Sequence, residues 1–135
     1  MKIVVDTYAW IEIFVGSEKG QKAKDYIEKA TEVYTPDTVL AEVARKYLRE
    51  GMKEDDVRDR LQLITEASDI RPINNEVALE SARSYTLLVS EAKNRGQKAP
   101  SLFDAIILAS ARLLEANILT GDEHLKSFHE TLWVG

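Results

Sequence analysis

The sequence predicts an α/β protein in which a parallel β-sheet lies between layers of helices. Five short runs rich in apolar and β-branched residues alternate with stretches of helical periodicity, which is typical of parallel strands joined by helical crossovers. The 135 residues show no repeat and no linker, so we expect one domain over residues 1–135. With 44% hydrophobic residues, a chain of this size can bury about two thirds of its surface without disulfides.

The strand predictions rest on short apolar runs that end at polar or turn-forming residues. The first run, Lys2 to Val5, is stopped by Asp6, and the fourth, Asn117 to Thr120, is stopped by Gly121. The five predicted strands are residues 2–5, 32–35, 69–73, 117–120 and 131–134.

Between the strands, apolar residues recur at the spacing of helices. Thr35 is placed to cap the helix after the second strand, with Pro36 at its first position and Gly51 beyond its end. The stretch from Ser101 to Ala116 is apolar nearly all round, which predicts a helix inside the core. The predicted helices are residues 7–14, 17–30, 36–50, 53–67, 74–95 and 101–116. The predicted inner face of the 74–95 helix comprises Val77, Ala78, Ser81, Ala82, Tyr85, Leu88, Val89 and Ala92.

The composition excludes several classes of site. The absence of cysteine rules out disulfides, thiolate zinc sites, iron–sulfur clusters and a cysteine nucleophile. The net charge of −5 argues against a broad basic surface for nucleic acid, but not against a nuclease with an acidic metal site. No uncharged apolar stretch is long enough to cross a membrane, and the N-terminus is unlike a signal peptide. We therefore expect a soluble, cytoplasmic protein.

Four acidic residues stand where the predicted fold would gather ligands, beyond the carboxyl ends of the strands. Asp6 and Asp122 follow the first and fourth strands, Glu42 lies in the helix after the second strand, and Asp104 opens the buried helix. Each also has an ordinary interpretation that stays open. Asp6 could cap the first helix, Glu42 could pair with Lys46, Asp104 could close a capping box, and Asp122 could belong to an ordinary turn.

Together, the four carboxylates predict a metal site. Two unit charges about 6 Å apart repel by about 3 kcal/mol at an effective dielectric constant of about 20, so converging carboxylates need a cation or bound protons. Oxygen ligands without thiolate or imidazole favour a hard ion, Mg²⁺ or Mn²⁺. Such an ion suits phosphodiester cleavage, because it activates a water molecule and stabilises the departing oxygen.

The order and surroundings of these acids resemble those of the PIN-domain nucleases and, within that family, the VapC toxins of prokaryotic toxin–antitoxin pairs. The resemblance spans the whole chain and is carried by four segments, residues 3–7, 39–43, 102–109 and 119–125. It implies a PIN-like three-layer α/β/α fold whose five-stranded parallel sheet has the order 3-2-1-4-5. It also implies a Mg²⁺- or Mn²⁺-dependent endoribonuclease, the toxin of a VapBC-type system.

The resemblance also implies roles for individual residues. The residues that match the family's acidic catalytic quartet are Asp6, Glu42, Asp104 and Asp122. Asp6, Asp104 and Asp122 are the expected metal ligands, Glu42 is expected to act through water, and Thr7 and Thr120 are expected to support the ligands with their hydroxyls. Either Asp104 or Glu42 would orient the attacking water. Since Glu123 points away from Asp122 in a helical turn, we expect one tightly bound ion, with a second arriving with the substrate.

Basic residues near the predicted cleft are candidates for contacts with RNA phosphates. A solvated helix end is an equally good interpretation of each group. The candidates are Lys93, Arg95 and Lys98 before the buried helix, and Arg45 with Lys46 and Arg49 after Glu42. His124 could donate a proton to a leaving oxygen, but we expect it to cover the sheet edge or face solvent.

Two protein partners are expected. Tyr8 and Trp10 are expected in the core or an interface, while Phe14 and Val15 extend an apolar surface that could form an antitoxin groove. A homodimer is expected through the helices 53–67 and 74–95.

Two other functions stay open. A phosphohydrolase with Asp6 as its nucleophile usually needs a second acid two residues on, where this chain has Tyr8. A catalytically silent PIN-like domain that binds RNA or protein would not need the complete acidic quartet. No phosphate-binding loop of either glycine-rich type occurs in the sequence.

Overall fold

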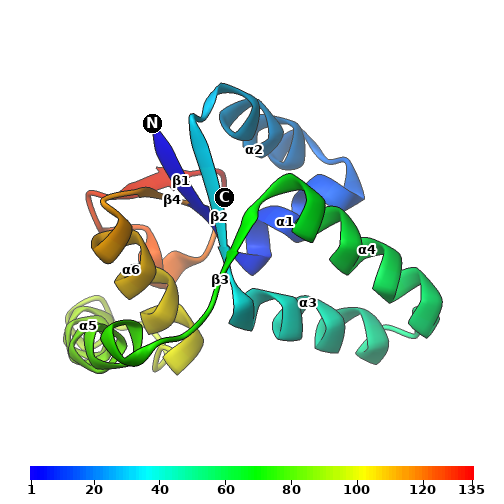
Figure 1. Cartoon of the computed structure of the whole chain (residues 1–135). Coiled ribbons are helices and arrows are strands. Elements are labelled where there is room, and N and C mark those ends of the chain that lie inside the picture. Colours follow the sequence, from blue (N-terminus) through cyan, green and yellow to red (C-terminus); the bar gives the residue numbers. More distant parts are fainter.

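The computed structural model describes all residues, 1–135. Its strands alternate with helices along the chain (Figure 1). A short 3₁₀ turn, η1, follows the fourth strand. The elements are β1 (Lys2–Val5), α1 (Thr7–Val15), α2 (Glu18–Lys29), β2 (Glu32–Pro36), α3 (Asp37–Arg49), α4 (Glu54–Ala67), β3 (Asp69–Arg71), α5 (Asn75–Asn94), α6 (Leu102–Leu114), β4 (Asn117–Thr120), η1 (Glu123–Leu125) and β5 (Thr131–Trp133).

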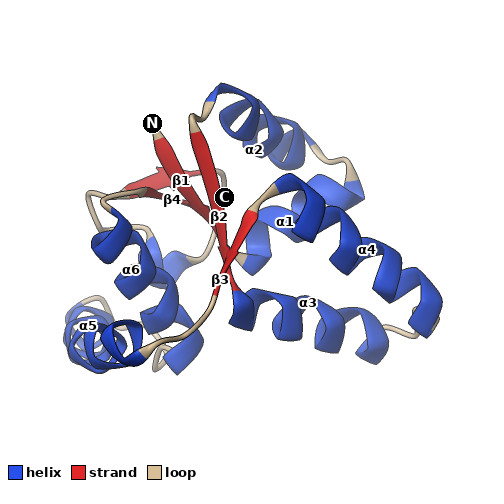
Figure 2. Cartoon of the chain, in the orientation of Figure 1, coloured by secondary structure: helices blue, strands red, loops and turns tan.

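The sheet confirms the predicted topology. Its five strands are all parallel, in the order β3-β2-β1-β4-β5. In Figure 2, helices α1 to α4 lie to one side of the strands and α5 and α6 to the other, as a three-layer α/β/α fold requires. The central strand β1 pairs with β2 and β4 on its two edges, and Ile3, Val4 and Val5 are fully buried. The carboxyl ends of β1, β2 and β4 therefore meet at one edge of the sheet.

Helix α6 lies in the core, as its all-round apolarity predicts. Every residue from Ala105 to Ala111 is buried, and α6 packs against α5, β1 and β4. Its first turn, which is more exposed, brings Asp104 close to Asp122 at the carboxyl edge of the sheet. None of the helices combines the length and the apolarity needed to span a membrane.

The predicted start of the helix after β2 is wrong by one residue. Strand β2 runs on through Pro36, which is in register with Arg71 of β3, and Pro36 occupies the N-cap of α3. The buried Thr35 hydroxyl accepts a hydrogen bond from Trp10 Nε1 (3.1 Å) and shares another with Ser68 Oγ (2.7 Å). With these partners inside the core, Thr35 does not turn back to cap α3.

The predicted inner face of α5 is correct in most positions and wrong in two. Ala78 and Ala82 are exposed, and Ser84 is buried beside Ser81 and Leu88. Helix α5 packs against α6, and the hydroxyls of Ser81 and Ser84 are buried without a hydrogen-bond partner. Hydrophobic periodicity cannot separate an exposed alanine from a buried serine, since it scores only polarity.

Candidate metal centre

Asp6 leaves the end of β1 and points across the carboxyl edge of the sheet. It is the N-cap of α1, where its Oδ1 accepts the Ala9 N–H (3.0 Å), and its Oδ2 accepts the Thr120 hydroxyl. Only 5% of Asp6 is exposed. Burial raises the pKa of Asp6 to about 7, against the opposing effect of the two hydrogen bonds and with smaller contributions from the Asp122 and Glu42 carboxylates. Asp6 is thus both a helix cap and a buried carboxyl beside other acids.

Thr120 joins the first strand to the fourth. Its hydroxyl donates to Asp6 and accepts the N–H of Asp122 (2.9 Å). Thr120 is fully buried at the end of β4, so this bridge is screened from water. One side chain therefore sets the position of Asp6 relative to the turn that carries Asp122.

Glu42 reaches the same edge from the second turn of α3. Its Oε1 accepts the hydroxyl of Thr7 (2.9 Å). The predicted pair of Glu42 with Lys46 does not form, since Lys46 Nζ pairs with Glu50 instead (3.2 Å). Burial and the Asp122 carboxylate raise the pKa of Glu42, while the Thr7 hydrogen bond and Arg45 oppose that shift.

Asp104 occupies the first turn of α6 and closes the capping box predicted for it. Its Oδ2 accepts the Ser101 N–H (2.9 Å), and Ser101 Oγ accepts the Asp104 N–H (3.2 Å). Burial and the neighbouring Asp122 carboxylate raise the pKa of Asp104 to about 6. Asp104 therefore both caps α6 and belongs to the centre.

His124 lies inside the centre, so the expectation that it covers the sheet edge or faces solvent is wrong. Its Nδ1 is 3.2 Å from Asp122 Oδ1 and 3.7 Å from Asp104 Oδ2. Its Nε2 is 2.8 Å from the carbonyl oxygen of Lys98. Asp122 Oδ1 also accepts the His124 N–H (2.9 Å), since Asp122 caps η1. This cap turns the histidine toward Asp104. In the sequence, the signal for this position of the ring is a histidine two residues after the aspartate that follows the strand.

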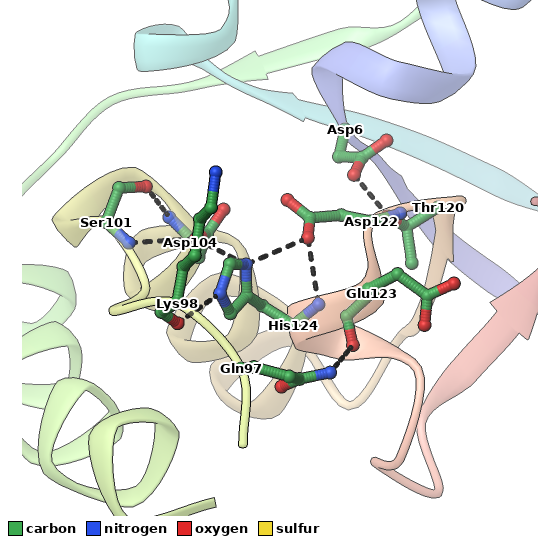
Figure 3. Close-up of polar contacts among 9 residues, drawn as sticks. All are labelled: Asp6, Gln97, Lys98, Ser101, Asp104, Thr120, Asp122, Glu123 and His124. Carbon is green, nitrogen blue, oxygen red and sulfur yellow. Dashed lines mark hydrogen bonds and ion pairs between the residues drawn. The ribbon is translucent and has the colours of Figure 1, made fainter. Parts of the chain in front are cut away.

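Asp122 is the point on which the other acids converge. Its charge raises the pKa of Asp6, of Glu42 and of Asp104. Figure 3 shows Asp122 between Asp6 on one side and Asp104 with His124 on the other. The four acids come from β1, α3, α6 and the turn after β4, as the sequence predicts for the carboxyl edge of the sheet.

The tightest group of possible metal ligands consists of Asp104, Asp122 and His124. One ligand atom from each lies within 4.8 Å of the other two. Two carboxylates and one imidazole form a donor set that suits a divalent ion. Asp6, which the resemblance implies as a metal ligand, is not part of this tight group.

The predicted RNA-binding residues flank the centre on two sides. On α3, Arg45, Lys46 and Arg49 line a small pocket of about 180 Å³ together with Thr7 and Glu42.

Lys93 lies in the last turn of α5, and Arg95 and Lys98 follow in the segment before α6, which makes contacts with neighbouring elements. The Lys98 carbonyl binds His124, Gln97 Nε2 donates to the Glu123 carbonyl (3.2 Å), and Arg95 pairs with Glu91 (3.3 Å).

An acidic cluster at the carboxyl edge of a 3-2-1-4-5 sheet defines a known class of protein. The sequence model of the PIN domain matches residues 3–130, and the chain belongs to this family. It is 27% identical over 130 residues to Ribonuclease VapC3 of Pyrobaculum aerophilum, covering 93% of this chain and 92% of that protein.

Solved structures show the same fold. A toxin–antitoxin complex from Klebsiella pneumoniae contains a chain with a TM-score of 0.71 and 21% identity, covering 98% of both chains. A DNA-bound VapBC from Salmonella typhimurium gives a TM-score of 0.73 at 11% identity, covering 100% of this chain and 99% of that chain.

Proposed function

We propose that this chain is a divalent-metal-dependent endoribonuclease and the toxin of a VapBC-type pair. The observation that carries the proposal is the convergence of three carboxylates, those of Asp6, Glu42 and Asp104, on a fourth, Asp122, in a chain that belongs to the PIN domain family. The carboxylates of such a cluster repel one another unless a cation lies between them or some of them remain protonated. The similarity to Ribonuclease VapC3 supports RNA as the substrate.

In this proposal Asp104 and Asp122 hold the ion directly, and Asp6 supports it from its buried position. A bound Mg²⁺ or Mn²⁺ supplies Lewis-acid stabilisation of the phosphodiester and activates the attacking water. Glu42 is the proposed base of the four acids, because it lines the basic pocket on α3 in which the RNA backbone would lie. The Thr7 hydroxyl fixes one of its oxygens and leaves the other free.

The pocket on α3 is the proposed contact for the RNA backbone. Arg45 and Arg49 line it without a carboxylate partner, whereas Lys46 is paired with Glu50. Glu42 also lines the pocket, so a phosphate bound there would be adjacent to the catalytic acids. This local concentration of bases offsets the overall negative charge of the chain. Lys93, Arg95 and Lys98 are the proposed contacts on the opposite side.

An antitoxin and a second copy of the chain are the proposed protein partners. Solved structures with this fold are described as VapBC or toxin–antitoxin complexes. Val15 is 69% exposed at the end of α1, and Leu48 and Leu63 are exposed on α3 and α4. We propose that an apolar antitoxin helix covers these residues, and that amide exchange in α1 slows when an antitoxin is co-expressed.

For the homodimer, α5 offers the exposed Leu79 and Leu87. A light-scattering mass of about 30 kDa, twice 15.2 kDa, would indicate a dimer.

The test of the activity compares Asp104→Asn with Asp25→Asn. Asparagine can keep the capping contact of Asp104 with the Ser101 N–H, so we expect a folded protein that neither binds Mn²⁺ nor cleaves RNA. Asp25 is exposed on α2, and its variant should behave as the unmodified protein does. Cleavage that survives both Asp104→Asn and a chelator would reject the proposal.

The two competing functions make different predictions. A silent binding domain would give no heat on calorimetric titration with Mn²⁺. A phosphohydrolase would form a covalent intermediate on Asp6, but both oxygens of this buried residue are hydrogen-bonded. Position 8, where a second acid would stand, is occupied by a tyrosine whose ring packs against Gly121.

A further inference from the structure

We infer that His124 is a ligand of the proposed metal ion through Nδ1, and that it makes the centre prefer Mn²⁺ and related transition ions over Mg²⁺. The inference rests on the proposed function, because it concerns the same ion. It adds a nitrogen donor to a site that the sequence indicates as built from oxygens alone.

The ligand atoms have the spacing that an octahedral ion requires. With bonds of about 2.1 Å, neighbouring ligand atoms lie about 3 Å apart and opposite ones about 4.2 Å apart. Nδ1 of His124 is 3.2 Å from Asp122 Oδ1 and 3.7 Å from Asp104 Oδ2, and the three residues offer ligand atoms within 4.8 Å of one another. An ion can therefore contact all three with small adjustments of the side chains.

The other nitrogen of the ring is bound in the way that metal-ligating histidines commonly show. Nε2 lies 2.8 Å from the Lys98 carbonyl oxygen, which can only accept, so Nε2 carries a proton. In the neutral ring this leaves the lone pair on Nδ1, which faces the two carboxylates. Histidine ligands of metals almost always donate their second N–H to a carboxylate, a backbone carbonyl or water.

The orientation of the ring is fixed without an ion. The Lys98 carbonyl holds Nε2, and Asp122 caps η1 through the His124 N–H. Nδ1 is therefore already directed at the position proposed for the ion.

The nitrogen donor determines which ion fits best. Imidazole suits first-row transition ions, among which Mn²⁺ binds most weakly, whereas Mg²⁺ prefers carboxylates, carbonyls and water. His124 should therefore raise the affinity for Mn²⁺ more than that for Mg²⁺.

The experiment uses the Mn²⁺-loaded, full-length chain and electron spin-echo modulation from ¹⁴N nuclei bonded to the ion. His129 is the only other histidine, and its side chain is 89% exposed, which makes His129→Gln a matched control for His124→Gln. We expect nitrogen modulation in the unmodified protein and in His129→Gln, and none in His124→Gln. By calorimetry, His124→Gln should lower the affinity for Mn²⁺ about tenfold or more and the affinity for Mg²⁺ by much less.

The possible results separate the role of His124 from the proposed nuclease function. Mn²⁺ that binds to the unmodified protein without nitrogen modulation would overturn the role of His124 and leave the metal-dependent nuclease intact. Failure of both Mn²⁺ and Mg²⁺ to bind would overturn the proposed function and this inference together. If His124→Gln does not fold, the spectra of the unmodified protein and of His129→Gln still decide, because no third histidine exists.

Discussion

Replacing Asp6 with Asn is expected to stabilise the metal-free protein at neutral pH, although it removes a residue of the centre. Asp6 is 5% exposed and lies near the Glu42 and Asp122 carboxylates. Ionisation of Asp6 in the folded state is therefore unfavourable, and asparagine avoids it. The side chain can keep the Ala9 N–H contact through its oxygen and donate to Thr120 through its amide.

The magnitude follows from the difference in pKa between the folded and unfolded states. The pKa of Asp6 is about 7 in the folded protein, against an ordinary value of 3.8 for an exposed aspartate, and this difference corresponds to about 4 kcal/mol. Below about pH 4 both states carry the proton and Asp6 has no effect. Between about pH 4 and 7 the unfolded state loses the proton first, so the free energy of unfolding falls as the pH rises. Above about pH 7 both states are ionised and the full loss persists.

The measurement is urea unfolding in EDTA, followed by fluorescence of Trp10 and Trp133, at several pH values between 4 and 8. Asp6→Asn should gain up to about 4 kcal/mol over the unmodified protein at pH 8 and nothing at pH 4. A smaller fall between about pH 4 and 6 should remain in the variant, because the pKa of Asp104 is also raised, to about 6. Asp25→Asn serves as the control for the loss of a carboxylate on the surface.

Saturating Mn²⁺ should reverse the order of stability, since the ion restores the unmodified protein at pH 8 and has less effect on Asp6→Asn. Two results would refute this reasoning. One is a free energy of unfolding for the unmodified protein that stays level between pH 4 and 8. The other is an Asp6→Asn variant that is destabilised equally at every pH.

Three further variants test other parts of the structure. Gly121→Ala places a Cβ 2.1 Å from the Tyr8 ring, so it should displace the turn that carries the fourth acid and weaken Mn²⁺ binding in calorimetry; the added change Tyr8→Ala should restore it. The double variant Arg45→Gln and Arg49→Gln should bind single-stranded RNA more weakly and lower the slope of log affinity against log salt by about 1.4. Arg112→Gln should cost about 2 kcal/mol in urea unfolding, since it leaves the buried Glu130 without its partner at 2.6 Å, without changing Mn²⁺ affinity.

The controls for these variants lie elsewhere on the surface. Arg58→Gln removes an exposed base that pairs with Glu54 on α4, and an equal loss of RNA affinity in this variant would reject the α3 pocket as the binding surface. If Tyr8→Ala fails to rescue Gly121→Ala, the close contact with the ring is not the cause of the defect. A drop in Mn²⁺ affinity for Arg112→Gln would show that its effect spreads beyond the pair with Glu130.

The fold could be predicted in outline because its signals are local and agree with one another. Each strand is a short apolar run, α6 is apolar all round, and the parallel order of the sheet follows the expected family pattern. The errors occur where a distant partner determines a local choice. Thr35 carries an ordinary capping side chain, but Trp10 and Ser68 bind it inside the core.

The centre shows the same limit. The four acids were recognisable because strand ends meet at one edge of a parallel sheet. His124 was not, because its position depends on a backbone carbonyl at Lys98 and on the cap that Asp122 provides for η1. No periodicity in the sequence contains that information, since residues 98 and 124 meet only after α6 and β4 have packed.

The hydroxyl bridge between Thr120 and Asp6 joins residues 114 positions apart, and this separation has a consequence for biosynthesis. While the ribosome is still making α6, strand β1 lacks its β4 neighbour, and neither Thr120 nor Asp122 yet exists. Loop closure over such a distance is among the slowest steps in folding. In the proposed function, the nascent chain therefore cannot cut RNA until β4 and the turn after it have been made, because the centre lacks Thr120 and Asp122 until then.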